Sequence, residues 1–153
     1  MLLNWLLGVL SVYALFLTAK KNNLRPEHSP ALFFSEYANY MGYIGAMAKH
    51  ESGNYTNKLS RDYNNIFSMT TPFQRPQISS GKTKRICNID NQCTQWQIYN
   101  SYSQAIEDLI LWLDYNKFPT DLKTVDQFVI ELKNKRYFTA PISEYLLGVK
   151  KFL

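Results

Sequence analysis

Apolar side chains recur at helical spacing along the first third of the chain, after a serine and a proline. Ser29 and Pro30 are typical of a helix N-cap and of the first helical position, and Gly53 is typical of a C-terminal stop. The recurring residues are Phe33, Tyr37, Tyr40, Ile44 and Met47. This pattern predicts a helix that begins at Ser29, buries one face and ends near Gly53.

Glu51 lies on the same stripe as these apolar residues. It follows Phe33 by 18 residues, which is five turns at about 3.6 residues per turn. The carboxyl group is therefore expected in the last helical turn, at the edge of the core. Apolar neighbours and a helix C-terminus both disfavour a negative charge, so we predict a raised pKa for Glu51.

The pattern changes between residues 70 and 100, where Pro72, Pro76 and Gly81 interrupt helices and residues 93–99 alternate with period two. This segment predicts a small β-hairpin lobe. Cys87 and Cys93 flank five residues that could form the end of the hairpin, and a disulfide between them would indicate an oxidising compartment or a virion. Two free, half-buried thiols are the alternative.

Helical periodicity returns after residue 100. Ser101 and Gln104 fit a capping box before a helix that runs to about Tyr115, and Thr124 and Gln127 repeat the pattern before a second helix. A last helix is expected after Pro141. The fold class predicted for the chain is α+β, mainly helical with one small β-hairpin lobe.

Residues 2–19 carry no charge and would extend about 27 Å as a helix, close to the hydrocarbon thickness of a bilayer. We interpret residues 1–19 as an N-terminal transmembrane anchor, 20–28 as a linker and 29–153 as the catalytic domain. A cleaved signal peptide is the alternative. By the positive-inside rule, the domain would be held on the cytoplasmic side by Lys20, Lys21 and Arg25. This orientation conflicts with the location inferred below.

The length and charge of the chain narrow the classes of function. A chain of 153 residues that is 46% apolar suits a single domain. Its net charge of +5 suits an anionic partner such as a cell wall, anionic lipid or nucleic acid, with a solvated basic surface as the alternative. Glycine-rich phosphate loops and zinc-type Cys/His spacings are absent from the sequence, so no cofactor or metal is expected.

Four motifs taken in order carry a family resemblance. They are HESG at 50–53, YNNIF at 63–67, YNSYSQAIEDL at 99–109 and RYFTAPISEY at 136–145. Their order and spacing resemble the bacterial endo-β-N-acetylglucosaminidase (flagellar-type muramidase) family of the lysozyme-like superfamily, to which lytic transglycosylases are near relatives. The resemblance covers roughly residues 30–153.

The resemblance implies roles for particular residues. The family's catalytic acid corresponds to Glu51, its cleft-lining element to Asn65 and Phe67, and its sugar-contacting tyrosine to Tyr137. Tyr63 and Trp96 are further candidates for sugar contact, with packing of the lobe as the alternative for Trp96. This chain departs from the family in having Ser68 for a glycine and Ala140 for an aspartate. Asp108 fits a helix-surface or structural role, and His50 is expected to be a solvated helix residue.

Cleavage of a glycosidic bond needs an acid for the leaving oxygen and a group that captures or stabilises the sugar cation. Glu51 would supply the acid. Three candidates remain open for the second role: Asp62 or Asp90 holding a water, the acetamido group of the substrate, or the muramic 6-hydroxyl. The last is the lytic transglycosylase route, in which Glu51 alone acts as acid and then as base.

The expected function is cleavage of peptidoglycan strands by a membrane-anchored glycosidase of N-acetylglucosaminidase or muramidase type. Its expected partners are peptidoglycan, a lipid membrane through residues 2–19, and other proteins of a bacterial envelope or a membrane-containing phage virion, with the domain facing the wall. The alternatives are a lytic transglycosylase that forms 1,6-anhydromuramic ends and a catalytically inactive wall-binding or structural membrane protein. Nucleic acid is not an expected partner.

Overall fold

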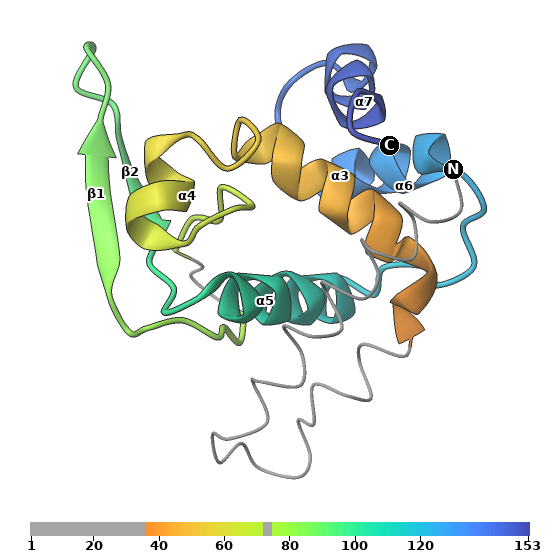
Figure 1. The fold of residues 1–153 in the computed structure, drawn as a ribbon, viewed down its shortest axis with the longest axis horizontal. Helices are drawn as coiled ribbons and strands as arrows, with labels where there is room; N and C mark the ends of the chain where they lie inside the picture. Colours follow the sequence, from red (N-terminus) through yellow and green to blue (C-terminus); the bar gives the residue numbers. More distant parts are fainter. Residues whose placement is uncertain (1–35, 72–74) are drawn as a thin grey trace, which may run out of the picture.

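The computed structural model describes residues 36–71 and 75–153, which form a mainly helical fold with one small two-stranded sheet (Figure 1). The helices are the 3₁₀ turn η3 (Ala38–Tyr40), α3 (Met41–Glu51), α4 (Lys58–Tyr63), α5 (Tyr102–Tyr115), α6 (Val125–Asn134) and α7 (Ile142–Lys150). The strands are β1 (Thr83–Cys87) and β2 (Cys93–Gln97). The predicted α+β character is therefore present in the described residues.

Helix α3 is the central element, with α5 on one side and α6 and α7 on the other (Figure 1). Tyr40, Ile44 and Met47 of the predicted stripe are buried in the core. Residues 29–35 of the predicted helix lie outside the described residues, and from Ala38 the helix begins as a 3₁₀ turn. Glu51 is the last residue of α3, as the spacing predicts.

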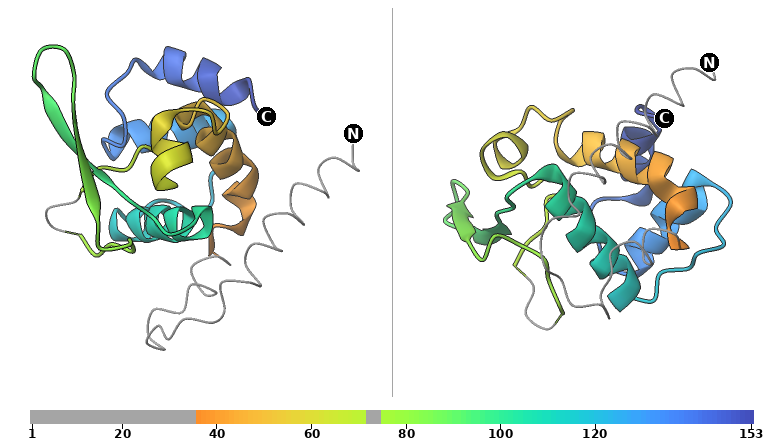
Figure 2. Two further views of the ribbon diagram at one scale, coloured as in Figure 1. Left: turned by 60° about the vertical axis from the view of Figure 1, so that its left-hand side comes forward. Right: turned by 60° about the horizontal axis from the view of Figure 1, so that its bottom comes forward.

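The predicted β lobe is an antiparallel hairpin that projects from the helices in all three views (Figures 1 and 2). Cys87 of β1 is paired in register with Cys93 of β2, and the two are joined by a disulfide, which confirms the predicted bridge. An isolated bridge between Thr70 and Trp96 continues the sheet towards the segment that follows α4. The lobe is thus connected to the end of the Asn65–Met69 turn.

The helices after the lobe begin where their caps predict. The side chain of Ser101 accepts a hydrogen bond from the backbone of Gln104, and Thr124 and Gln127 form a complete capping box. In α5 the Gln104 side chain instead accepts from the backbone N–H of Asn100 at 2.7 Å, so its capping box is incomplete. Both helices bury the apolar face that their periodicity predicts.

Helix α4 is an element that the hydrophobic pattern did not predict. It is six residues long and is capped by Asn57, whose side chain accepts a hydrogen bond from the backbone of Ser60 at 2.9 Å. Asn64 ends it in the left-handed conformation, with φ of 53°. A helix this short presents too few apolar residues for its periodicity to be recognised.

Within residues 36–71 and 75–153, none of the helices has the length and apolar character needed to cross a membrane. The anchor predicted for residues 1–19 and the linker predicted for residues 20–28 lie outside the described residues.

Candidate active site

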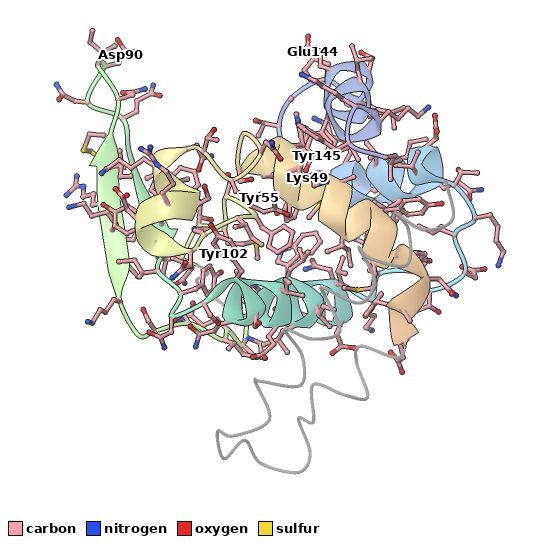
Figure 3. All side chains as sticks on the ribbon, in the orientation of Figure 1. Lys49, Tyr55, Asp90, Tyr102, Glu144 and Tyr145 are labelled. Carbon is pink, nitrogen blue, oxygen red and sulfur yellow. A yellow bond between two sulfur atoms is a disulfide. The ribbon has the colours of Figure 1, made fainter. Side chains whose placement is uncertain are left out.

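Glu51 lies at the C-terminal end of α3, half-buried beneath α7. Its carboxylate oxygen Oε1 accepts a hydrogen bond of 2.7 Å from the hydroxyl of Tyr145, a buried residue of α7. The contact joins two helices that are distant in sequence. It fixes the orientation of the carboxyl group, and Tyr145 itself lies on the side of the molecule away from the hairpin lobe (Figure 3).

Tyr145 is itself held between two rings. Phe138 stacks on it with ring centroids 3.8 Å apart, and the His50 imidazole meets it edge-on at 4.8 Å. The close approach of α7 to α3 depends on Gly148, because a Cβ atom there would overlap the His50 imidazole. His50, which the sequence suggested to be a solvated helix residue, is instead half-buried and packs against the tyrosine that contacts Glu51.

The environment of Glu51 raises its pKa above that of an ordinary glutamate side chain. Burial is the largest cause, since it disfavours the charged form. Hydrogen bonds from Tyr145 and Ser68 and the charge of His50 act in the opposite direction without cancelling it. The carboxyl group is thus biased towards the protonated form, in the direction predicted from the sequence.

Ser68 stands where the family resemblance has glycine, and its backbone explains that preference. Its φ of 51° lies in the left-handed region, which glycine adopts without a steric penalty. The serine hydroxyl donates a hydrogen bond of 3.5 Å to the backbone carbonyl of Glu51. The departure from glycine therefore adds a polar group directly beside the candidate acid.

Asn65 and Phe67 are both buried, so they support the site from within the protein. The Asn65 side chain accepts from the backbone N–H of Met69 at 2.8 Å and donates to the carbonyl oxygens of Met69 at 2.8 Å and Gln97 at 3.0 Å. These bonds fix the turn that carries Ser68 and fasten it to strand β2. In this structure both side chains contact the protein interior.

Tyr137 lies next to this turn. Its hydroxyl donates a 2.6 Å hydrogen bond to the carbonyl oxygen of Phe67, and its ring meets Trp112 of α5 edge-on at 5.0 Å. Burial raises the pKa of Tyr137 well above its usual range, and the nearby Glu51 carboxyl adds to the shift. Tyr137 thus connects the Glu51 region with the C-terminal part of α5.

A groove of about 460 Å³ is lined by Ser68 and Tyr137, two neighbours of Glu51, although Glu51 itself is not among its lining residues. Two arginines, hydroxyl groups and aromatic rings line it. The lining residues are Ser68, Met69, Thr70, Thr71, Arg75, Trp112, Tyr115, Asn116, Arg136 and Tyr137. Such a mixture of aromatic faces and polar groups suits an amphipathic ligand such as a sugar.

Asp62 and Asp90, the two candidates for a second carboxylate, are both exposed, and neither lines the groove. Asp62 is exposed on α4 and forms an ion pair with Lys58, which lowers the pKa of Asp62 through a hydrogen bond. Asp90 is exposed at the end of the hairpin, whereas Tyr145, the hydrogen-bond partner of Glu51, lies on the far side of α4 (Figure 3).

The two remaining candidates for sugar contact lie near the hairpin lobe. Tyr63 is the last residue of α4, half-buried, and its carbonyl oxygen accepts a backbone hydrogen bond from Tyr99 at 2.9 Å. Trp96 is half-buried on β2 opposite Lys84. The structure places neither residue in the groove lining.

Sequence reasoning missed the contact of Tyr145 and the partners of Asp108. Asp108 is buried, where it pairs with Arg75 and accepts a 2.7 Å hydrogen bond from the Tyr99 hydroxyl. The RYFTAPISEY motif contains Tyr145, which was one signal available. A contact between residues so far apart in sequence has no local pattern that could reveal it.

Within the described ranges, no group of three His, Cys, Asp or Glu side chains is placed to hold a metal ion.

A mainly helical fold with a small hairpin and a half-buried carboxyl group at the end of its central helix is the plan of lysozyme-like glycosidases. Residues 33–146 match the glucosaminidase family, described as mannosyl-glycoprotein endo-beta-N-acetylglucosaminidase. The chain belongs to this family, and the resemblance drawn from the four motifs is confirmed. No curated protein sequence matches it at a significant level.

Solved structures show the same fold at low sequence identity. A peptidoglycan hydrolase from Sphingomonas sp. A1 aligns with a TM-score of 0.59 and 18% identity over 79% of this chain and 87% of its own. The catalytic domain of the autolysin Auto from Listeria monocytogenes aligns with a TM-score of 0.55 and 15% identity over 94% and 92%. The glycoside hydrolase domain of Salmonella typhimurium FlgJ gives 0.51 and 19% over 80% and 78%.

Proposed function

We propose that this chain cleaves the glycan strands of peptidoglycan, with Glu51 as the general acid. The observation that carries the proposal is a half-buried carboxyl group of raised pKa whose neighbours Ser68 and Tyr137 line a groove with aromatic and polar walls. A peptidoglycan hydrolase and an autolysin are among the solved structures that share the fold, and the name of the first gives peptidoglycan as its substrate.

Glu51 would act by protonating the oxygen of the leaving sugar. A carboxyl group kept protonated by burial can donate this proton nearer to neutral pH than an exposed one. The Tyr145 hydroxyl donates to Oε1. When Glu51 loses its proton, that bond stabilises the carboxylate, which can then take a proton back from the group that attacks the sugar.

The placement of the acids favours routes that need one protein carboxylate. Asp62 is exposed and paired with Lys58, Asp90 is exposed at the hairpin end, and neither lines the groove, which supports a mechanism without a second protein carboxylate. In one such route the acetamido oxygen of the substrate attacks C1, and water then opens the ring that forms. In the other the muramic 6-hydroxyl attacks C1 and gives its proton to Glu51, which is the lytic transglycosylase reaction.

We also propose that the domain works on the wall side of a membrane, in a bacterial envelope or a membrane-containing virion. The Cys87–Cys93 disulfide supports this location, because disulfides persist in oxidising compartments and are rare in the cytosol. The apolar segment of residues 2–19 would provide the anchor.

Digestion of purified peptidoglycan by the full chain, with mass spectrometry of the products, tests the proposed function. We expect soluble glycan fragments. Reducing N-acetylglucosamine, reducing muramic acid and anhydromuramic ends differ in mass or in reducibility, so the same experiment identifies the bond and the route. Binding to the wall without release of any fragment would contradict the proposal and favour an inactive wall-binding protein.

Tyr145→Phe is expected to move the alkaline limb of the pH–activity profile to higher pH. The Tyr145 hydroxyl stabilises the charged form of Glu51 and so lowers its pKa; without it the pKa rises further. A general acid works only while protonated, so activity would then persist to higher pH. The measurement is kcat/KM on wall fragments across pH.

Tyr102→Phe is the matched control for that profile. Tyr102 begins α5, where it stacks on Tyr55 with ring centroids 5.7 Å apart, well separated from Tyr145 (Figure 3). Its profile should match that of the parent. An unchanged alkaline limb in Tyr145→Phe would show that Tyr145 does not tune the acid.

A further inference from the structure

The groove near Glu51 contains two arginines, of which one is paired with an acidic residue and the other is not. Arg75 is already neutralised: its Nη1 and Nη2 donate to the two carboxylate oxygens of Asp108 at 2.9 and 2.8 Å, and both side chains are almost fully buried. Its positive charge is therefore directed into the protein and away from a ligand.

Arg136 is the second arginine, and its side chain is exposed at the wall of the groove. Within residues 36–71 and 75–153, no acidic group forms an ion pair with it, and no acidic residue lines the groove. Trp112 and Tyr115 lie along the same groove, and Tyr115 is 50% exposed. The groove thus combines exposed aromatic surface with one uncompensated cation.

We infer that Arg136 is a specificity-determining residue that selects a sugar carrying a carboxylate. The inference rests on the proposed function, since in peptidoglycan every second sugar bears a lactyl ether whose carboxyl group is free or extended by an acidic peptide. A guanidinium group binds a carboxylate through two parallel N–H···O bonds. Neutral polymers of N-acetylglucosamine offer no such group.

The neighbouring aromatic rings suit the rest of such a ligand. Trp112 and Tyr115 can pack against the apolar face of a sugar ring, and the Asn116 amide and the Thr70 hydroxyl can bond its polar groups. These contacts would be similar for neutral and acidic sugars. The charge of Arg136 therefore discriminates between acidic and neutral sugars.

The backbone at Arg136 allows a clean test. Arg136 follows the end of α6 with φ of 59°, while the next residue, Tyr137, donates its N–H to the carbonyl oxygen of Leu132 at 2.9 Å. Glycine is the residue preferred at this position of a helix C-terminus. Arg136→Gly therefore removes the guanidinium group without opposing the local conformation.

Lys117 provides a matched control at the end of α5. It has φ of 50°, and the N–H of Phe118 likewise donates to the carbonyl oxygen of Leu113 at 2.9 Å. Lys117 is exposed but does not line the groove. Lys117→Gly thus removes one positive charge from the same type of helix end without altering the groove.

The experiment is calorimetric titration of the full chain carrying Glu51→Gln, which prevents turnover. Four ligands of equal sugar length are compared: a glycan with free lactyl carboxyls, its lactyl methyl amide, the glycan bearing acidic peptides, and a neutral N-acetylglucosamine oligomer. Arg136→Gly should weaken binding of a carboxylate-bearing glycan by about 10-fold or more, the low end of a charge-assisted hydrogen bond. Binding of the methyl amide and the neutral oligomer should not change.

The ligand whose affinity falls in Arg136→Gly identifies which carboxylate Arg136 binds, that of the lactyl group or that of the peptide. Arg136→Lys should keep part of the preference and Lys117→Gly all of it. If all four ligands bind the parent with the same affinity, or Arg136→Gly weakens all of them equally, the inference is overturned while the proposed function stands. If no glycan binds the parent, the proposed function is overturned and the inference with it.

Discussion

Glu51→Gln is expected to lower wall cleavage by at least about 100-fold, the low end of the contribution of a general acid. Glutamine has nearly the same shape as a protonated glutamate, and its amide oxygen can still accept the hydrogen bond from Tyr145. It has no acidic proton to give to the leaving sugar. The variant should therefore bind the wall as the parent does and release fragments far more slowly.

Two measurements separate this effect from loss of the fold. Thermal unfolding of Glu51→Gln should match that of the parent, because the replacement is neutral like the protonated acid that burial favours. Asp62→Asn and Asp90→Asn should cleave at close to the parent rate, since one carboxylate is paired on α4 and the other is exposed at the hairpin end. Cleavage by Glu51→Gln at the parent rate would show that Glu51 is not the general acid.

A severe loss in Asp62→Asn or Asp90→Asn would have a different meaning. It would show that a second protein carboxylate positions the attacking water, and that the hairpin lobe or α4 moves towards Glu51 when substrate binds. The routes that use the acetamido group or the 6-hydroxyl would then be excluded, with Glu51 still the acid.

The sequence predicted those features that depend on local patterns. Tyr40, Ile44 and Met47 repeat at helical spacing, and that spacing alone placed Glu51 on the buried face at the end of α3. The disulfide followed from two cysteines separated by a length suited to a hairpin end. In each case the residues that define the feature lie within a few turns of one another, so the chain's local geometry determines it.

Features that depend on contacts between distant segments could not be predicted in this way. The hydroxyl of Tyr145 on α7 reaches Glu51 at the end of α3, and no spacing rule connects these two distant residues. The groove is also assembled from distant segments. The ion pair between Arg75 and Asp108, which distinguishes Arg75 from the exposed Arg136, is another contact of this kind.

Asp108→Ala is expected to destabilise the domain by about 3–5 kcal/mol, the range for breaking a buried ion pair by removing one partner. The Asp108 carboxylate accepts two hydrogen bonds from Arg75, one from the Tyr99 hydroxyl at 2.7 Å and one from the backbone N–H of Ile78 at 2.9 Å. Alanine would leave all of these donors unsatisfied, including a buried positive charge. The free energy of unfolding in urea and the unfolding temperature measure the effect.

Asp114→Ala on the same helix is the matched control. Asp114 is exposed, so the same substitution should change the free energy of unfolding by no more than about 0.5 kcal/mol.

If Asp108 acts mainly by compensating Arg75, then Arg75→Ala together with Asp108→Ala should be less destabilising than the two single changes added, because the uncompensated charge is gone. Strict additivity, or a loss in Asp108→Ala as small as that in Asp114→Ala, would show that the pair does not hold α5 to the segment after residue 75.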